Sequence, residues 1–367
     1  MKKKMVIAVA MLMTIGTMMT GCGTTAKTET ETVDLNSMTV EEIAEKATEE
    51  GEVNSVGMPD DWANWAETWQ EVTENYGLKH TDVDLSSAEE LSIFEAEKKN
   101  ATKDIGDVGI SYAKLAEEQG LTMKYKTSNW DSIPDWAKDD DGDWMVGYTG
   151  SISILTNKNL VDKVPTSFQD VLEGDYVVCV GDVAKGTKEQ CTLLAVAKAL
   201  GGDESNIDPA LEYFRTLAEQ GRLYMGESKF AQIEKGEIPV AFVWDFVGMG
   251  YKETLEENNS NASFEVTVPT EGTVQTGYST IINSYTTRPY AAAITREYIL
   301  SDEGQLNFVK GHARPIRDIE IPAEYEGYLA EIDESTPVYQ IEDDEAWEKT
   351  IETIGTRWQE EVMAYAK

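Results

Sequence analysis

The sequence predicts an α/β protein of two lobes with a hinged cleft between them. Predicted strands alternate with predicted helices along most of the chain, which is the pattern of an open α/β sheet. The 367 residues leave room for two lobes of ordinary domain size. The chain is expected to pass from the first lobe to the second near residues 151–155 and to return near residues 266–273. Two such crossings form a hinge, which suits a cleft that closes on a small ligand.

The N-terminus predicts export from the cytoplasm. Residues 2–4 are lysines, and residues 5–13 form an apolar stretch that is too short to span a bilayer as a mature helix. The segment Met19–Cys22 resembles a bacterial lipobox with Met in place of the usual Leu. The resemblance implies that residues 1–21 are a signal peptide and that Cys22 is lipidated after cleavage.

Residues 22–50 are expected to connect the lipid to the folded part of the chain. From Gly23 to Leu35 the sequence is rich in Thr, Glu and Lys and has little to bury, so it reads as a disordered acidic tether. Thr39 as N-cap predicts a lead-in helix that ends near Glu50. The protein is therefore expected outside the cytoplasm, anchored to the bacterial cell membrane by lipid, because no later stretch is apolar enough to cross it.

The large negative net charge of the chain argues against nucleic acid and anionic lipid headgroups as partners. The formal net charge is −37, and removal of residues 1–21 takes away three lysines and no acid, which makes it −40. Such a chain repels nucleic acid and anionic lipid headgroups. Most of the acid is expected only to solvate the surface, although a cationic ligand would be attracted.

The cysteines and histidines predict no cofactor and no metal site. Three cysteines are too few for a disulfide framework. Cys179 and Cys191 are expected to be reduced core residues, with a mutual disulfide as the lesser alternative. Neither histidine has the spacing of a zinc site. The acidic run 139–143 is not an EF-hand loop, because Gly150 stands where the closing Glu belongs.

The first lobe, residues 51–152, is expected to open with a strand at 53–56. Gly57-Met-Pro59 then supplies a sharp turn. A helix is expected to begin at Asp60 or Asp61, since an acidic side chain caps free amide groups and suits the positive helix end.

Three tryptophans share one face of this helix. Trp62, Trp65 and Trp69 recur at helical spacing. An aromatic stripe of this kind usually packs against a sheet, so Trp65 and Trp69 are expected in the core. Trp62 stands in the first turn, at the edge of the sheet where ligands enter.

The other elements follow from caps and apolar runs. A double capping-box pattern at 86–90 predicts a helix to about residue 99. Residues 181–188 are not a P-loop, because Thr187 precedes Lys188. Further strands are expected at 79–84, 104–109, 144–149, 150–156, 176–180, 240–244, 264–268 and 278–283. Further helices are expected at 111–119, 189–200, 209–220, 228–235, 290–300, 302–310 and 344–365. We place the second lobe at 153–268, and the return to the first lobe with the C-terminal helices at 269–367.

Several motifs resemble the extracellular solute-binding proteins of ABC importers, in the iron/polyamine/phosphonate-type group. The resemblance spans about residues 52–317 and is closest to spermidine/putrescine-binding proteins. It implies a periplasmic-binding-protein-like fold of type II, no enzymatic activity, and delivery of a small molecule to an ABC permease with its ATPase subunits. The motifs are Gly57-Met-Pro-Asp-Asp-Trp62, Asp104-Ile-Gly-Asp-Val-Gly109, Val146-Gly-Tyr-Thr-Gly150, Val243-Trp-Asp245, Pro269-Thr-Glu-Gly272, Tyr298-Ile-Leu-Ser-Asp-Glu-Gly-Gln305 and Gly311-His-Ala-Arg-Pro-Ile-Arg317.

A polyamine-like cation is the ligand that the residues favour. Such a site needs carboxylates to pair with ammonium groups and aromatic faces to cover methylenes and cations. Trp244 and Asp245 are the leading pair, with a buried Trp beside a strand-ending Asp as the alternative. Asp107 has the alternative of capping the next helix. The candidate ligand-binding residues are Asp60, Asp61, Trp62, Asp107, Tyr148, Asp182, Trp244, Asp245 and Glu271.

Two other ligand classes and one other kind of function stay open. Ferric iron is disfavoured because related iron binders often carry adjacent tyrosines, which this chain lacks, although Tyr148 and Tyr278 could converge. A phosphonate or sugar phosphate would use helix N-termini at Ser86-Ser87, Ser111 and Thr187. A lipid-anchored hydrolase is the remote alternative, since no histidine stands near a nucleophile pattern and nothing marks a particular carboxylate pair.

Overall fold

A computed structural model describes residues 33–366 of the chain. The predicted signal peptide, the lipidation site Cys22 and most of the tether lie outside the described residues. From Asp34 onward the chain forms one compact unit. None of the helices in this part of the chain combines the length and the apolar character that crossing a bilayer requires.

One sheet of eleven strands runs through the described residues. Its strands are ordered β2-β1-β3-β9-β4-β7-β5-β6, while β8 and β10 pair with β4, and β11 pairs with β9. The strands are β1 (Glu52–Val56), β2 (Lys79–Thr81), β3 (Ile105–Gly109), β4 (Trp144–Asn157), β5 (Val178–Cys179), β6 (Leu223–Tyr224), β7 (Val240–Trp244), β8 (Phe264–Thr267), β9 (Thr273–Ile282), β10 (Arg314–Pro315) and β11 (Val338–Tyr339).

The helices alternate with these strands, as the sequence predicts. They are α1 (Val40–Glu50), α2 (Trp65–Tyr76), α3 (Ser87–Glu97), α4 (Ile110–Glu118), α5 (Phe168–Glu173), α6 (Thr187–Ala199), α7 (Asp208–Glu219), α8 (Phe230–Glu234), α9 (Asp245–Asn258), α10 (Pro289–Ile299), α11 (Asp302–Lys310) and α12 (Asp344–Glu361).

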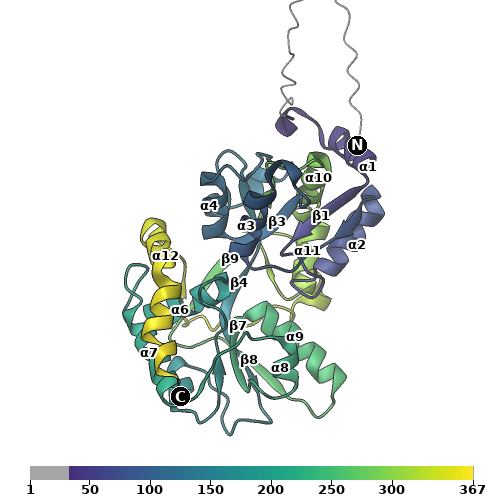
Figure 1. The fold of residues 1–367 in the computed structure, drawn as a ribbon. Helices are drawn as coiled ribbons and strands as arrows, with labels where there is room; N and C mark the ends of the chain where they lie inside the picture. The colour runs from purple at the N-terminus through teal and green to yellow at the C-terminus, as the bar shows by residue number, and fades with distance from the viewer. Residues whose placement is uncertain (1–32, 367) are drawn as a thin grey trace, which may run out of the picture. The chain divides into compact units, whose positions relative to one another are not determined.

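The long strands β4 and β9 join two groups of elements, which we call the first and the second lobe (Figure 1). The first lobe contains β1–β3 with α1–α4, α10 and α11. The second lobe contains β5–β8 with α5–α9 and α12. The early part of β4 pairs with β9 and its later part pairs with β7 and β8, so one strand belongs to both lobes. This arrangement confirms the predicted two-lobed α/β fold, whereas the lobe boundaries at 152 and 268 stay predictions.

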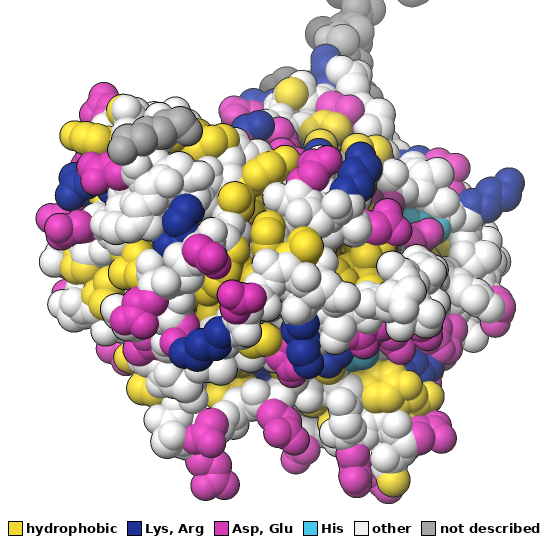
Figure 2. Space-filling model, turned by 90° about the horizontal axis from the view of Figure 1, so that it is seen from below, with side chains coloured by type: hydrophobic (Ala, Val, Ile, Leu, Met, Phe, Trp, Pro, Cys, Tyr) yellow, Lys and Arg dark blue, Asp and Glu magenta, His cyan; other side chains and the backbone are white. Residues whose placement is uncertain are grey.

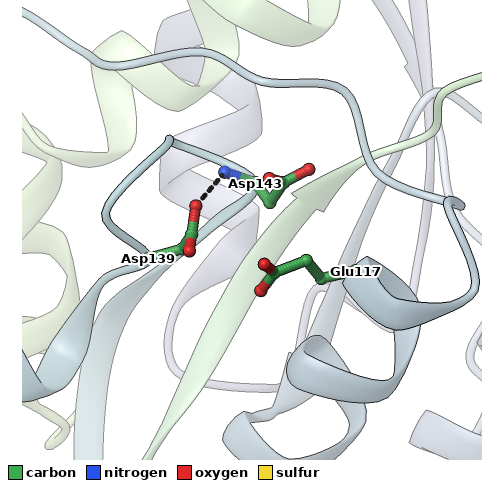
Figure 3. Close-up of side chains that lie close together, drawn as sticks. All are labelled: Glu117, Asp139 and Asp143. Carbon is green, nitrogen blue, oxygen red and sulfur yellow. Dashed lines mark hydrogen bonds between the residues drawn. The ribbon is translucent and has the colours of Figure 1, made fainter.

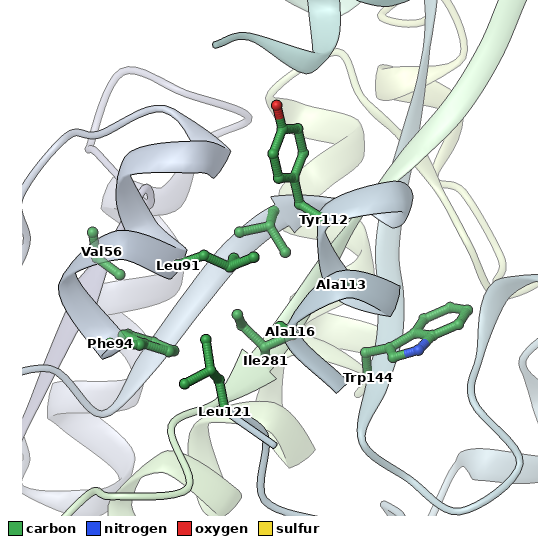
Figure 4. Packing of buried hydrophobic residues seen from close by; sticks show 10 residues of the cluster. Val56, Leu91, Phe94, Tyr112, Ala113, Ala116, Leu121, Trp144 and Ile281 are labelled. Atoms are coloured by element: carbon green, nitrogen blue, oxygen red, sulfur yellow. The ribbon is translucent and has the colours of Figure 1, made fainter. Parts of the chain in front are cut away.

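Each lobe has its own apolar core. In the first lobe, side chains of β1, β3, α3 and α4 meet around Phe94, Leu121 and Ile281 (Figure 4). In the second lobe, Val243 of β7 packs with Leu255 of α9 and neighbouring apolar side chains. Burial of these faces provides most of the driving force for folding.

The predicted start of the helix after β1 is wrong. Asp60 and Asp61 lie in a turn, and α2 begins only at Trp65. The reason lies in the backbone, since Ala63 and Asn64 adopt the left-handed region with φ of 48° and 60°, which a right-handed helix does not contain. The predicted role of the two aspartates as helix caps therefore fails.

Other predictions of local structure are confirmed or shifted. Thr39 caps α1 in a capping box, as predicted. The strands expected at 144–149 and 150–156 form one strand of 14 residues. Cys179 and Cys191 are buried free thiols, which confirms the expectation that they are reduced. The C-terminal helix α12 packs on the second lobe, where Trp358 meets Phe214 with ring centroids 5.4 Å apart.

The acidic side chains are spread over the surface. Figure 2 shows Asp and Glu side chains distributed over the face seen from below, with Lys and Arg between them. On this face the negative charge solvates the surface and does not form one large patch.

Candidate ligand-binding site

Five aromatic side chains meet where β4, β9 and the start of α9 come together. We call them the aromatic cluster. Trp62 meets Phe246 and Tyr278 edge-on, with ring centroids 5.1 and 5.5 Å apart. Tyr148 stacks on Tyr278 at 5.8 Å. Trp244 meets Tyr278 edge-on at 6.1 Å. The cluster combines rings from both lobes, because Trp62 precedes α2 while Trp244 and Phe246 flank the start of α9.

A chain of hydrogen bonds leads from the aromatic cluster to Asp107. The Trp62 indole N–H donates to the Tyr148 hydroxyl at 2.6 Å, and that hydroxyl donates to Oδ2 of Asp107 at 2.6 Å. Strand β3 places Asp107 beside β9, and β9 lies between β3 and β4. The neighbouring strands thus hold Asp107, Tyr148 and Tyr278 in fixed positions.

Asp107 is a buried carboxyl group with spare capacity to accept hydrogen bonds. Its side chain is 1% exposed, and neither its Oδ1 atom nor the neighbouring Trp65 indole N–H makes a hydrogen bond of good geometry within the described residues. Burial raises the pKa of Asp107 to about 8, while the Tyr148 hydroxyl and the Trp65 indole oppose this shift. Burial thus favours the neutral acid of Asp107 over the carboxylate.

Asp245 is also buried, but one of its carboxylate oxygens accepts hydrogen bonds from backbone N–H groups. Its Oδ1 atom accepts the N–H groups of Ser151 and Phe246, both at 2.9 Å. Its Oδ2 atom lies 3.6 Å from the Arg314 guanidinium group. Burial raises the pKa of Asp245, and the charge of Arg314 opposes this shift. Asp245 thus ties α9 to β4 and to the segment that returns from α11.

Two predicted site residues lie away from the aromatic cluster. Glu271 accepts the N–H groups of Phe168 and Gln169, both at 3.1 Å, and so caps the N-terminus of α5. Asp182 lines a cavity of about 520 Å³ in the second lobe, together with Glu227 and residues of α12. The structure therefore does not bring either carboxylate to Asp107.

Asp60 and Asp61 are exposed in the turn that carries Trp62. The charge of Asp61 acts on groups of both lobes, since it contributes to the raised pKa of Asp84 in the first lobe and of Tyr251 in the second. Burial is the larger cause in both cases. Asp61 thus lies at the rim where the two lobes approach each other.

The lobes touch through the N-termini of three helices. Oγ of Ser87, at the start of α3, accepts the N–H of Gly109, which precedes α4, at 3.2 Å. The same oxygen lies 3.4 Å from Oγ1 of Thr187, the first residue of α6. Lys185, just before α6, forms an ion pair with Glu89 of α3 at 3.2 Å. Three helix N-termini converge here, an arrangement that favours an anion.

The aromatic cluster is closed by its own side chains. Tyr148 and Trp244 are at most 1% exposed, and Tyr278 is 9% exposed. Neither the 520 Å³ cavity nor a second cavity of about 400 Å³ beside α4 includes these residues. In this arrangement Asp107 and the rings of Tyr148, Trp244 and Tyr278 have little or no contact with solvent.

Three carboxylates away from the aromatic cluster also lie close together. Oxygen atoms of Glu117, Asp139 and Asp143 lie within 4.8 Å of one another (Figure 3). Their contacts are already protein groups: Asp139 accepts three backbone N–H groups, Glu117 accepts the Trp144 indole, and Asp143 accepts the Thr122 hydroxyl. We assign no metal ion to this group.

Sequence reasoning missed Glu90, which is buried at the back of the site. Glu90 is 1% exposed, and its Oε2 atom accepts the N–H of Asp107 at 3.1 Å. The signal was present in the sequence: Ser87, Glu90, Leu91 and Phe94 recur at the spacing of one helix face, and all four are buried. Phe246 was also missed, although it directly follows the predicted pair.

The chain resembles known binding proteins in sequence and in fold. Residues 100–337, more than half of the chain, match the family model described as bacterial extracellular solute-binding protein. A search of curated proteins gives no match.

Three solved structures illustrate the likeness in fold. AfuA, a periplasmic binding protein from Actinobacillus pleuropneumoniae with exogenous fructose-6-phosphate bound, is 18% identical with a TM-score of 0.69, covering 85% of this chain and 98% of AfuA. Iron-bound HitA from Pseudomonas aeruginosa is 14% identical with a TM-score of 0.65, covering 83% and 98%. A periplasmic thiamin binding protein is 18% identical with a TM-score of 0.67, covering 85% and 96%. At these identities the likeness shows the fold alone.

Proposed function

Because the chain belongs to the bacterial extracellular solute-binding protein family, we propose that the solute it captures is a small polyamine-like cation. A solute-binding protein of this family works outside the cytoplasm with an ABC permease. We propose that it is held at the membrane by a lipid on Cys22 and hands the cation to the permease, whose ATPase subunits supply the energy. The family and the similar structures are binding proteins, and we propose no catalytic activity.

The observation that carries the cation proposal is the free carboxyl oxygen of Asp107 beside the aromatic cluster. An ammonium group that pairs with Oδ1 forms a charge-assisted hydrogen bond in a site from which water is excluded. Trp62, Tyr148 and Tyr278 now pack against one another. On separation of the lobes, these rings would supply π surface for a cation and apolar cover for its methylene groups. We propose Trp244 and Asp245 as the second wall, with Asp60 and Asp61 at the rim.

Ferric iron is less favoured by the same residues. Iron binding by tyrosine uses the ionised phenolate, but burial raises the pKa of Tyr148 and of Tyr278 well above the usual value. The Tyr148 hydroxyl is also already engaged with Asp107 and Trp62. The likeness to iron-bound HitA concerns the fold.

A phosphorylated solute is the second candidate, and a separate observation favours it. The N-termini of α3, α4 and α6 meet at Ser87, Gly109 and Thr187, and this arrangement suits a phosphate group. Against it stand Glu89 and Glu189, which already place negative charge in the first turns of α3 and α6.

A thermal-shift screen of the chain from residue 23 separates these candidates. A ligand that binds only the native state raises its apparent stability by mass action. We expect putrescine or spermidine to raise the melting temperature, and ferric salts, phosphonates and sugar phosphates to leave it unchanged. A shift with a sugar phosphate and none with either polyamine would replace our proposal by the second candidate.

A further inference from the structure

Glu90 and Asp107 form a pair of buried carboxyl groups that come from different elements. Glu90 lies in the first turn of α3, and Asp107 lies in the middle of β3. Each is 1% exposed. They are joined through the backbone, since Oε2 of Glu90 accepts the N–H of Asp107 at 3.1 Å.

The backbone around Glu90 leaves space for its carboxyl group and for little else. A Cβ atom on Gly57 would lie 2.3 Å from Oε1 of Glu90, and one on Gly106 would lie 2.9 Å from Oε2. Gly57 also has a φ of +72°, which favours glycine. Because Gly57 opens the turn that leads to Trp62, the Glu90 carboxyl group contacts both the Trp62 turn and the strand of Asp107.

The charged groups that act on this pair are acids. Asp107, Asp82 and Asp84 all raise the pKa of Glu90 well above the usual value, in addition to burial, which is the largest cause. Asp82, in the segment after β2, also raises the pKa of Asp107. The other groups facing Asp107 are neutral: the Tyr148 hydroxyl of β4 and the Trp65 indole of α2.

Two buried carboxyl groups without a cation are stable only in the neutral form. We propose that Glu90 and Asp107 both carry a proton while the site is empty, and that an ammonium group arriving beside Asp107 drives the Asp107 proton out to solvent. The O–H bond of Asp107 breaks, its electron pair stays on the carboxylate, and the ammonium group keeps its own protons. Glu90 stays neutral, so the pair accepts one positive charge. This inference rests on the proposed function and adds its coupling to pH.

If binding of the cation releases the Asp107 proton, the affinity for the cation depends on pH. Binding to a carboxylate that is already ionised would not show this dependence. Below pH 8 the cation competes with a proton for Asp107, so its apparent affinity falls about tenfold for each unit of decreasing pH. Above about pH 8 Asp107 is already ionised, and this dependence disappears. Acidic surroundings therefore favour release of the cation.

Calorimetry of the chain from residue 23 with putrescine tests the coupling. Titrations at pH 7 in two buffers with different ionisation enthalpies count the protons released. With the Asp107 pKa at about 8, we expect about nine-tenths of a proton per putrescine for the wild-type chain. Binding of putrescine with no proton release would overturn the inference and leave the proposed function standing.

Two variants identify the carboxyl groups. Asp107→Asn is expected to abolish the proton release. Glu90→Gln copies the neutral acid, so the pH at which the affinity levels off is expected to stay near 8. A fall of this midpoint by a unit or more in Glu90→Gln would show that Glu90 is ionised in the empty site, and this would overturn the claim of two protons.

Absence of putrescine binding would reject the proposed function without deciding the inference. In that case carboxyl ¹³C NMR of the ligand-free chain decides it, with Asp107→Asn and Glu90→Gln to assign the signals. An Asp107 signal that titrates near pH 8 supports the claim that Asp107 carries a proton in the ligand-free chain, whereas one that titrates near the usual Asp pKa of about 4 overturns the inference.

Discussion

One carboxyl oxygen of Asp107, Oδ2, accepts a hydrogen bond from the Tyr148 hydroxyl. The other oxygen, Oδ1, accepts no hydrogen bond from the described residues. A buried acceptor of this kind costs free energy unless a partner satisfies it. We interpret the free oxygen as the attachment point for the ligand. Asp245 also has one oxygen, Oδ2, without a hydrogen bond from the described residues, but that oxygen lies 3.6 Å from the Arg314 guanidinium group, whereas both oxygens of Glu271 accept backbone N–H groups.

Replacing Asp107 by Asn tests this interpretation, because it exchanges one carboxyl oxygen for an amide nitrogen. The substitution keeps the shape but removes the negative charge, and a hydrogen bond to a charged group contributes about 1.5–3 kcal/mol. We expect the affinity for putrescine to fall about 10- to 150-fold in calorimetry, while the melting temperature at pH 7 is maintained. The matched control is Glu271→Gln, which weakens the cap of α5 and leaves putrescine affinity unchanged. Equal losses in both variants would contradict the assignment of Asp107.

His80 gives a prediction about acid stability. Its ring stacks on Trp69 with centroids 3.6 Å apart, and its Nε2 atom lies 2.8 Å from the Ser55 hydroxyl. Burial, and then the charge of Lys103, lowers the pKa of His80 to about 4. The unfolded chain therefore binds this proton first, and stability is lost as the pH falls from about 6.5 towards 4.

We expect His80 to account for a loss on the order of 2 kcal/mol across this window, since part of the ring remains exposed to solvent. Urea unfolding at several pH values measures the loss. The variant His80→Gln should show a shallower decline between pH 6.5 and 4 than the wild-type chain. Parallel declines in the two proteins would show that His80 carries no such coupling.

Among the elements, the approach of α6 to the end of β3 depends on a glycine. A Cβ atom on Gly109 would lie 2.3 Å from Oγ1 of Thr187. The lobes can therefore come this close only because residue 109 has no side chain.

Substitution of Gly109 by Ala should weaken any ligand, whatever its charge, because it opposes closure. We expect the putrescine affinity to fall at least tenfold, and small-angle X-ray scattering with saturating ligand to report a more open molecule. The matched control is Gly250→Ala in α9, where a Cβ atom meets nothing closer than 3.9 Å. Unchanged affinity in Gly109→Ala would show that capture does not need the contact between Gly109 and Thr187.

The elements also show what the sequence could predict. Alternating strands and helices, the cap at Thr39 and the strand positions of Asp107 and Tyr148 follow from local patterns, whereas Trp62, predicted in the first turn of the helix, lies in the turn before α2. The start of α2 could not be predicted, because it depends on left-handed backbone at Ala63 and Asn64, which local propensity does not favour.

For the candidate site, the sequence predicts the positions of residues better than it predicts their contacts. Glu271 lies in a turn and Asp245 at the start of α9, as the pattern predicts, but their backbone partners are fixed by tertiary packing. Glu90 lies on a helix face that periodicity does reveal. Its contact with the backbone N–H of Asp107 depends on the packing of α3 against β3, which one sequence does not specify.

For the whole molecule, the net charge of −37 predicts how a cation arrives. An acidic surface attracts a cation over a distance of about 10 Å at 0.1 M salt, so association should slow as salt increases. Replacing Asp60 and Asp61 at the rim by Asn should lower the association rate of putrescine severalfold and leave its dissociation rate nearly unchanged. Stopped-flow measurements at several salt concentrations check this. A change confined to dissociation would place the two aspartates in direct contact with the ligand.

The central claim is that this solute-binding protein captures a cation beside Asp107. The most direct test is calorimetric titration of the chain from residue 23 with putrescine and, separately, with fructose 6-phosphate, each repeated on Asp107→Asn. We predict saturable binding of one putrescine per chain, lost or strongly weakened in Asp107→Asn, and no heat of binding for fructose 6-phosphate. Binding of fructose 6-phosphate that is unaffected by Asp107→Asn, with no binding of putrescine, would contradict the claim.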